Sequence, residues 1–225
     1  EQIRAFAKIV ENDHLVYGHK PVHWCLDCKS ALAEAEVVYQ DKESIAIDVR
    51  FKVSDVDEFC SRVGLNQPKA NRSVCVPIWT TTPWTLPANQ AVVLGNDLDY
   101  ILVAADIGQG LDYFVVAQGL EESIRDRWQS SNWETIGSIN QKDLEGLLLD
   151  HPFYDRGVPI LLGDHVTLET GTGAVHTAPA HGHDDFIIGK EHDLPLDNPV
   201  NAVGVYNEST ELFAGEHVYK VEPSI

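Results

Sequence analysis

Ser73-Val74-Cys75-Val76-Pro77-Ile78-Trp79 runs directly into Thr80-Thr81-Thr82-Pro83, and this segment is the best single guide to the architecture. Its β-branched and aromatic residues favour a strand. Pro77 has no amide hydrogen to give to a central ladder, so the strand is expected at an edge or a bulge. The segment therefore predicts a strand whose carboxyl end carries a polar, threonine-rich loop.

Strands also dominate the sequence around this segment. Residues 45–53 alternate apolar and polar side chains, the period of a half-buried strand. Further strands are predicted at 91–94, 100–105, 113–117, 158–161 and 173–178. Helices are predicted from Ser30 to about Ala35, from Ser54 to a stop at Gly64, and at 120–128 and 184–192. Many strands with few, scattered helices predict a mainly β fold, a β-barrel-like body with peripheral α-helices.

The chain divides by composition into three parts. Residues 1–36, irregular in period up to residue 30, are expected to form an incoming linker or small lobe, residues 37–205 the main body, and residues 206–225 an exit segment. The first residues lack an initiator Met and the apolar core of a signal peptide, and the chain contains no Met. We therefore expect a piece of a longer protein.

Composition excludes several classes of function. The 225 residues include 16 Lys and Arg against 35 Asp and Glu, a formal charge of −19, which argues against a free-standing nucleic-acid binder. No apolar run approaches the roughly 18 residues of a membrane span, so no membrane partner is expected. Four cysteines are too few for a disulfide scaffold, which favours a reducing compartment and predicts a cytoplasmic location.

The segment from Trp79 to Asn89 is the first whose residue types are suited to catalysis or substrate binding. Alternation along a strand end points Thr80 and Thr82 one way and Thr81 the other. Two prolines, Pro83 and Pro87, then restrict the backbone. Such a loop presents hydroxyls, two indoles and an amide, and can position a water molecule and a polar substrate without reorganising. The plain alternative is a threonine-rich strand followed by an ordinary proline turn.

The second such segment spans residues 169–186 and holds three histidines and two acids within ten residues, namely His176, His181, His183, Asp184 and Asp185. His181-x-His183-x-Asp185 matches the opening of the metal-binding signature of metallo-β-lactamase-like hydrolases. However, Phe186 replaces the final histidine of that signature, and no later segment supplies further ligands. Two acids at a helix start also have a plain role, since they stabilise the positive end of the helix dipole.

Cys25-x-x-Cys28 is half of a zinc site. A structural zinc needs two such pairs, and Cys60 and Cys75 do not form one. Either the second pair lies in another part of a longer protein, or these are ordinary loop cysteines.

Taken together, Trp79–Asn89 and Gly171–Phe186 closely resemble the editing domain inserted in isoleucyl-tRNA synthetase, the CP1 insertion of a class I synthetase. The segment from Pro21 to Val37 is similar to the stretch that leads into this insertion, and the resemblance covers about residues 17–205. The ATP-binding signatures His-Ile-Gly-His and Lys-Met-Ser-Lys-Ser are absent. This chain alone is therefore not expected to activate amino acids.

The resemblance implies a deacylase that clears valine from valyl-tRNA(Ile), and also valyl-adenylate. It implies that Asp185 binds the α-ammonium group, that His176 limits the size of the side-chain pocket, and that the three threonines contact the terminal adenosine and hold the attacking water. The remaining residues implied for the pocket are Trp79, Thr85, Asn89 and Ala178.

The partners implied are the aminoacylated 3′ end of tRNA(Ile), valine, valyl-adenylate and the rest of the synthetase. No cofactor is implied for editing, and zinc at Cys25 and Cys28 needs ligands from outside this chain. Two alternatives stay open. One is a metal-dependent hydrolase that uses His181, His183 and Asp185, and the other is a catalytically silent binding insert.

Overall fold

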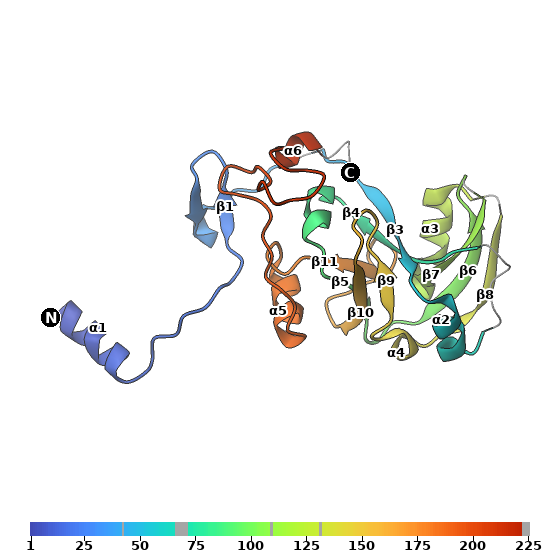
Figure 1. Ribbon diagram of the computed structural model, residues 1–225, viewed down its shortest axis with the longest axis horizontal. Helices are drawn as coiled ribbons and strands as arrows, with labels where there is room; N and C mark the ends of the chain where they lie inside the picture. The colour runs from blue at the N-terminus through green and yellow to red at the C-terminus, as the bar shows by residue number, and fades with distance from the viewer. Residues whose placement is uncertain (42, 66–71, 109, 131, 222–225) are drawn as a thin grey trace.

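The computed structural model describes residues 1–41, 43–65, 72–108, 110–130 and 132–221. Most of the described chain belongs to one large sheet (Figure 1). Its strands are β3 (Ile47–Val53), β4 (Val74–Thr80), β5 (Ala91–Gly95), β6 (Tyr100–Asp106), β7 (Leu111–Ala117), β8 (Trp133–Ile139), β9 (Leu148–Asp150), β10 (Gly157–Gly163) and β11 (Ala174–Thr177). Their order is β11-β5-β10-β9-β3-β4-β7-β6-β8. The mainly β prediction is confirmed.

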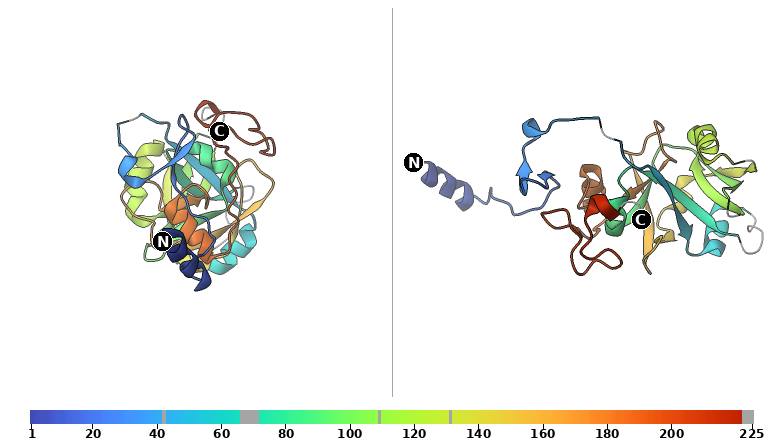
Figure 2. Two further views of the ribbon diagram at one scale, coloured as in Figure 1. Left: turned by 90° about the vertical axis from the view of Figure 1, so that its left-hand side faces the viewer. Right: turned by 90° about the horizontal axis from the view of Figure 1, so that it is seen from above.

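Helices are short and peripheral (Figures 1 and 2). They are α1 (Gln2–Glu11), α2 (Val56–Val63), α3 (Glu121–Trp128), α4 (Gln141–Leu144), α5 (His183–Glu191) and α6 (Val218–Val221), with 3₁₀ turns η1 (Glu34–Glu36), η2 (Pro83–Ala88) and η3 (Gln118–Leu120). The helix predicted to stop at Gly64 is α2. The Asp55 carboxylate caps it by accepting from the Glu58 amide, and Gly64 ends it in the left-handed region at φ 65°.

The sheet curls on itself without closing its ladder in the described part of the chain. Strand β11 lies against β4, although four strands separate the two in the sheet order. The Thr172 hydroxyl, just before β11, donates to the Pro77 carbonyl of β4 over 2.6 Å. Pairing of β4 with β7 ends at Cys75, so at Pro77 this inner strand has β3 as its only ladder partner among the described residues. The proline expected at an edge thus lies where one side of the strand is locally free.

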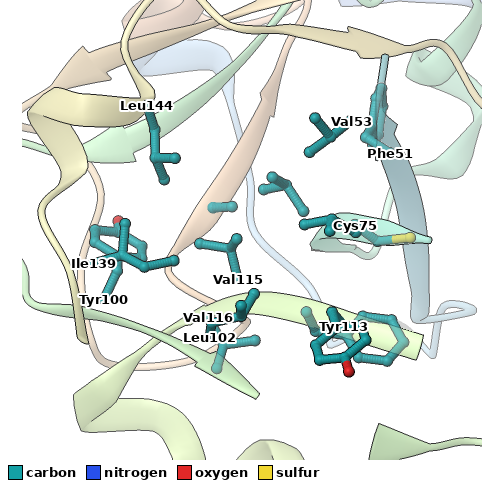
Figure 3. Close-up of a cluster of buried hydrophobic side chains, with 14 of the residues drawn as sticks. Phe51, Val53, Cys75, Tyr100, Leu102, Tyr113, Val115, Val116, Ile139 and Leu144 are labelled. Carbon is teal, nitrogen blue, oxygen red and sulfur yellow. The ribbon is translucent and has the colours of Figure 1, made fainter. Parts of the chain in front are cut away.

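The main core packs side chains of the large sheet together with those of α2, α3 and α4, and Figure 3 shows part of it. Phe51, Tyr100 and Phe114 are at most 1% exposed, and each apolar side chain buried in this way stabilises the fold by about 1.5–3 kcal/mol. A second cluster packs α5 against β5 and β10. A third cluster ties residues after 200 to the loop after β4, since Tyr206 and Phe213 pack with Trp84.

Two predictions about the first 36 residues are wrong. The helix expected from Ser30 is strand β2 (Ser30–Leu32), which pairs with β1 (His23–Cys25) in a hairpin, so this pairing overrides the local helix propensity of the Ala-Leu-Ala-Glu run. Residues 2–11, treated as irregular, form α1, which stands away from the body with every residue exposed (Figure 1).

Strand β8 was not predicted, because its residues are mostly exposed and show no clear alternation. No helix in the described ranges combines the length and the apolar character needed to cross a membrane. Residues 222–225, the end of the predicted exit segment, lie outside the described residues.

Candidate functional site

The two chemical segments of the sequence meet where β4 ends beside β11. The Gln90 amide donates to the Thr177 carbonyl over 2.8 Å, and the Thr85 hydroxyl lies 2.8 Å from Nε2 of His176, although 91 residues separate Thr85 and His176 in the chain. The fold therefore places the threonine loop, residues 80–89, against the strand that carries His176. These contacts form one candidate site.

The threonine loop opens with a tight turn made by its own hydroxyls. The buried Thr80 hydroxyl accepts from the Thr82 amide over 3.1 Å, and its oxygen lies 3.4 Å from that of Thr82. Thr80 and Thr82 thus share a side, as alternation predicts. Thr81 and Thr82 are exposed, whereas Thr80 is buried. Thr81 and Thr82 are therefore the threonines that solvent reaches, and Thr80 shapes the turn.

His176 lies between two residues of the threonine loop. Its Nε2 contacts the Thr85 hydroxyl, and its Nδ1 lies 3.3 Å from the side-chain nitrogen Nδ2 of Asn89. Burial, together with the neighbouring imidazoles of His181 and His151, lowers the pKa of His176 to about 4. The ring is consequently neutral at physiological pH.

Asp185 lies at the start of α5, against the end of β11. The pKa of its carboxyl is raised to about 6, mainly by burial and also by the charge of Asp184, while the Ala178 amide, which donates to the carboxyl, acts in the opposite direction. A half-buried carboxyl at the end of the His176 strand, with its ionised form disfavoured by its surroundings, is a candidate functional group.

Glycines allow the strand of His176 to approach the sheet closely. Gly171 and Gly173 have φ values of 92° and 81°. A Cβ on Gly173 would lie 2.2 Å from Cβ of Ala117, and one on Gly171 would lie 3.8 Å from Cβ of Trp79. The strand before His176 therefore needs glycine at Gly173, where no Cβ fits, and the half-buried Trp79 lies beside Gly171.

The threonine loop is held from behind by side chains that sequence reasoning missed. The Tyr206 hydroxyl donates to the Trp84 carbonyl over 2.6 Å, and His151 Nε2 donates to that of Leu86 over 3.1 Å. The Arg156 guanidinium donates to the Pro87 and Asn89 carbonyls at 3.2 and 2.6 Å. We call Tyr206, His151 and Arg156 the rear supports. Nothing in their local sequence marks them, because they lie far from the loop along the chain, 65 residues in the case of His151 and Leu86 and 122 in that of Tyr206 and Trp84.

A cleft of about 510 Å³ opens next to the loop. It is bounded by the β1–β2 hairpin, the loop, the turn after β11 and the segment after residue 197. Its walls include the rings of Trp24, Trp84, His181 and Tyr219, and the Trp84 and His181 rings meet edge to face at 5.4 Å. None of the described residues that line it is Asp, Glu, Lys or Arg. In a chain with a charge of −19, this cleft is an uncharged aromatic surface.

The sequence suggests two candidate metal sites, one at His181, His183 and Asp185 and one at Cys25 and Cys28. In the part of the chain that the structure describes, no three His, Cys, Asp or Glu side chains are arranged to hold a metal ion. His181, His183 and Asp185 are thus not brought together as ligands. Cys25 and Cys28 lie in the β1–β2 turn, where the Cys28 amide donates to the Cys25 sulfur over 3.2 Å. Zinc there remains a prediction that needs further ligands.

Comparison with known proteins identifies the family. The model of class I tRNA synthetases for isoleucine, leucine, methionine and valine matches residues 1–221. The isoleucine–tRNA ligase of Alkalilimnicola ehrlichii is 50% identical over 224 residues, which is 99% of this chain and 23% of that protein. That of Nitrosococcus oceani is 52% identical over 223 residues, 99% of this chain and 24% of that protein. The chain thus spans about a quarter of the length of these relatives.

Solved structures show the same fold in isolated domains. The crystal structure named GlLeuRS-CP1 superposes with a TM-score of 0.62 at 14% identity, over 80% of this chain and 93% of that one. The editing domain of the cytosolic leucyl-tRNA synthetase of P. knowlesi gives a TM-score of 0.61 at 11% identity, over 80% and 90% of the two chains. At these identities the likeness concerns the fold.

Proposed function

The chain belongs to the class I tRNA synthetases, and on this basis we propose that it is the editing domain of an isoleucyl-tRNA synthetase, which hydrolyses valyl-tRNA(Ile) and also valyl-adenylate. The observation that carries the proposal is the junction of the threonine loop with His176. The proposal is supported by the exposure of Thr81 and Thr82, by the neutral imidazole of His176, and by the contact of Asp185 with the residue that follows the His176 strand.

The proposed reaction is needed because a binding pocket discriminates only weakly between isoleucine and valine. One buried methylene contributes only about 0.8 kcal/mol, so a pocket discriminates by roughly 10–200-fold between substrates that differ by one methylene, and isoleucine against valine is the standard example of this limit. Valine cannot be kept out of a pocket made for isoleucine. A second, smaller pocket that hydrolyses valyl esters and excludes isoleucyl esters supplies the missing selectivity.

Each side chain then has a role. The Asp185 carboxylate binds the α-ammonium group, a contact that every aminoacyl ester can make. His176 forms the wall that excludes the longer side chain of isoleucine. The Thr81 and Thr82 hydroxyls contact the terminal ribose and hold the attacking water, and Thr80 keeps the turn in shape.

Positioning supplies most of the rate enhancement. An aminoacyl ester is already activated, so a water molecule held beside the ester carbonyl needs neither a metal ion nor a covalent nucleophile. In this proposal Trp79 and Ala178 also line the amino-acid pocket. The proposal includes no cofactor for editing.

The uncharged cleft fits the approach of a single-stranded 3′ end. Base rings stack on aromatic side chains, whereas the phosphates of tRNA would be repelled by a surface with a net charge of −19. The rest of the synthetase, acting in the cytoplasm, therefore has to hold the body of the tRNA. We expect the isolated chain to deacylate tRNA poorly compared with a full-length synthetase.

The test is hydrolysis of valyl-tRNA(Ile) by the full-length synthetase and by its variant with Asp185→Ala. We expect the variant to lose hydrolysis while its circular dichroism spectrum stays that of the unchanged protein. Asp184→Ala is the matched control, since it removes a neighbouring exposed carboxylate from the same helix start. An Asp185→Ala variant that deacylates at the unchanged rate would refute the proposed site.

A further inference from the structure

Hydrogen bonding around His176 is complete without any substrate, and this decides which nitrogen carries the proton. Thr85 Oγ1 has a single hydrogen and two polar neighbours, the Thr82 carbonyl at 2.9 Å and Nε2 of His176 at 2.8 Å. A carbonyl can only accept, so the hydroxyl donates to it. The Thr85 oxygen then accepts from the imidazole, and Nε2 must carry a hydrogen.

The other side of the ring gives the same answer independently. The Asn89 side-chain nitrogen lies 2.9 Å from the Ala91 carbonyl and 3.3 Å from Nδ1 of His176. The reverse orientation of this amide would set its oxygen against the Ala91 carbonyl, two acceptors facing each other. The NH₂ group therefore donates one hydrogen to Ala91 and the other to Nδ1, which must be unprotonated.

We propose that Thr85 and Asn89 are positioning residues that lock His176 in the neutral Nε2–H tautomer and so turn it into a wall with no free donor or acceptor. The consequence for amino-acid selection rests on the proposed function, whereas the tautomer itself does not.

The lock explains how a polar ring can act by size. Both nitrogens are occupied by the protein, so only carbon atoms of the ring remain to face an alkyl side chain. No lone pair is left to take a proton from water, which removes His176 as a general base. Two fixed contacts at opposite nitrogens also hold the ring plane, so the wall cannot rotate to admit an extra methylene.

Protonation would break the arrangement. An Nδ1–H would face the Asn89 NH₂ group, donor against donor, which agrees with the direction of the pKa shift of His176. The titratable groups that act on this ring, His181 and His151, are themselves buried imidazoles with lowered pKa values. Neither offers a negative charge that would stabilise an imidazolium.

The first experiment reads the tautomer directly. Long-range ¹H–¹⁵N spectra of the histidine-labelled 225-residue chain are recorded between pH 5 and 8, and the His176 signals are assigned from their loss in His176→Gln. We expect one neutral Nε2–H species throughout this range. An Nδ1–H species, two exchanging species, or a titration midpoint near the ordinary value of about 6.5 would overturn the lock.

Variants then separate the lock from a general structural role. Asn89→Asp replaces the donor to Nδ1 by an acceptor, so we expect protonated His176 at pH 6. Asn140→Asp is the matched control, with the same change of charge at an exposed helix cap where Asp serves equally well. Thr85→Val removes the acceptor for Nε2–H, and Thr85→Ser restores it. A His176 spectrum that Asn89→Asp and Thr85→Val leave unchanged would refute their positioning role.

Hydrolysis gives the second readout. With the full-length synthetase carrying Thr85→Val, we expect the preference for valyl over isoleucyl ester to fall by about 10-fold, within the roughly 10–200-fold that a one-methylene pocket provides, and Thr85→Ser to recover it. If the spectra show the lock but no protein hydrolyses valyl ester, the proposed function fails and the lock stands. If hydrolysis is selective but the spectra show a different tautomer, the lock fails alone.

Discussion

Replacing Asp185 by Asn should make the protein more stable and less active at the same time. The folded protein disfavours the ionised carboxyl, with a pKa of about 6 against 3.8 for the unperturbed group. Between these two pKa values the folded state binds more protons than the unfolded state, so the free energy of unfolding falls as the pH rises. The cost is small below pH 3.8, grows between the two pKa values and is constant above about 6.

The magnitude follows from the two pKa values. The shift corresponds to at most about 3 kcal/mol at pH 7 and about 0.5 kcal/mol at pH 4. Loss of a negative charge from the start of α5 destabilises the variant by about 0.3–1 kcal/mol, because that charge interacts favourably with the helix dipole. We therefore expect Asp185→Asn to stabilise the fold by about 2 kcal/mol at pH 7 and by very little at pH 4. The Asn side chain keeps an oxygen that can accept from the Ala178 amide.

Urea unfolding of the isolated chain at both pH values measures this difference, with Asp184→Asn as the control for the dipole. Hydrolysis of valyl-tRNA(Ile) by the full-length synthetase with Asp185→Asn measures the expected loss of activity. Loss of one charge-assisted contact costs about 1.5–3 kcal/mol, or roughly 10–150-fold in kcat/KM. The ionised fraction of Asp185 falls from about nine-tenths at pH 7 to about one-tenth at pH 5, so the unchanged enzyme should lose about tenfold in kcat/KM. An Asp185→Asn variant that is destabilised at pH 7 yet fully active would contradict both expectations.

Three further outcomes are expected. His176→Ala should allow isoleucyl-tRNA(Ile) to be cleaved, and continued full rejection of isoleucine in a deacylation assay would remove His176 from the pocket wall. Tyr206→Phe deletes the hydrogen bond to Trp84 and should cost about 0.5–1.5 kcal/mol in urea unfolding, with a lower kcat/KM because the threonine loop loses a support; unchanged kinetics would show that the loop keeps its shape without it. EDTA should leave hydrolysis of valyl ester intact, whereas a loss that zinc restores would favour the metal-dependent alternative built on His181, His183 and Asp185.

Local pattern was enough to predict most of the sheet but not its curvature. The strand at Tyr100–Asp106 is marked by a continuous apolar run, and α2 by its apolar face and terminal glycine. The error at Ser30 has a physical cause, because three residues in a hairpin owe their conformation to the partner strand rather than to their own propensity. The contact of β11 with β4 depends on the twist of all the strands between them.

The candidate site shows the same division. The threonines, His176 and Asp185 were predicted because their residue types are unusual together and because the chain resembles a known family. The pairing of Thr85 and Asn89 with the two nitrogens of one ring could not be predicted, since it needs the relative placement of segments 87–91 residues apart. Hydrogen-bond partners at such separations are set by tertiary structure alone.

The rear supports make the threonine loop dependent on distant parts of the chain. Tyr206, His151 and Arg156 bind its carbonyls from outside, in addition to the loop's own prolines and short-range hydrogen bonds such as that from the Thr85 hydroxyl to the Thr82 carbonyl. Grafting residues 79–89 onto the end of a strand in another scaffold would therefore transfer the side chains without their geometry. To build this loop elsewhere, a designer has to begin with a scaffold that provides three hydrogen-bond donors in place of Tyr206, His151 and Arg156, and add the threonines last.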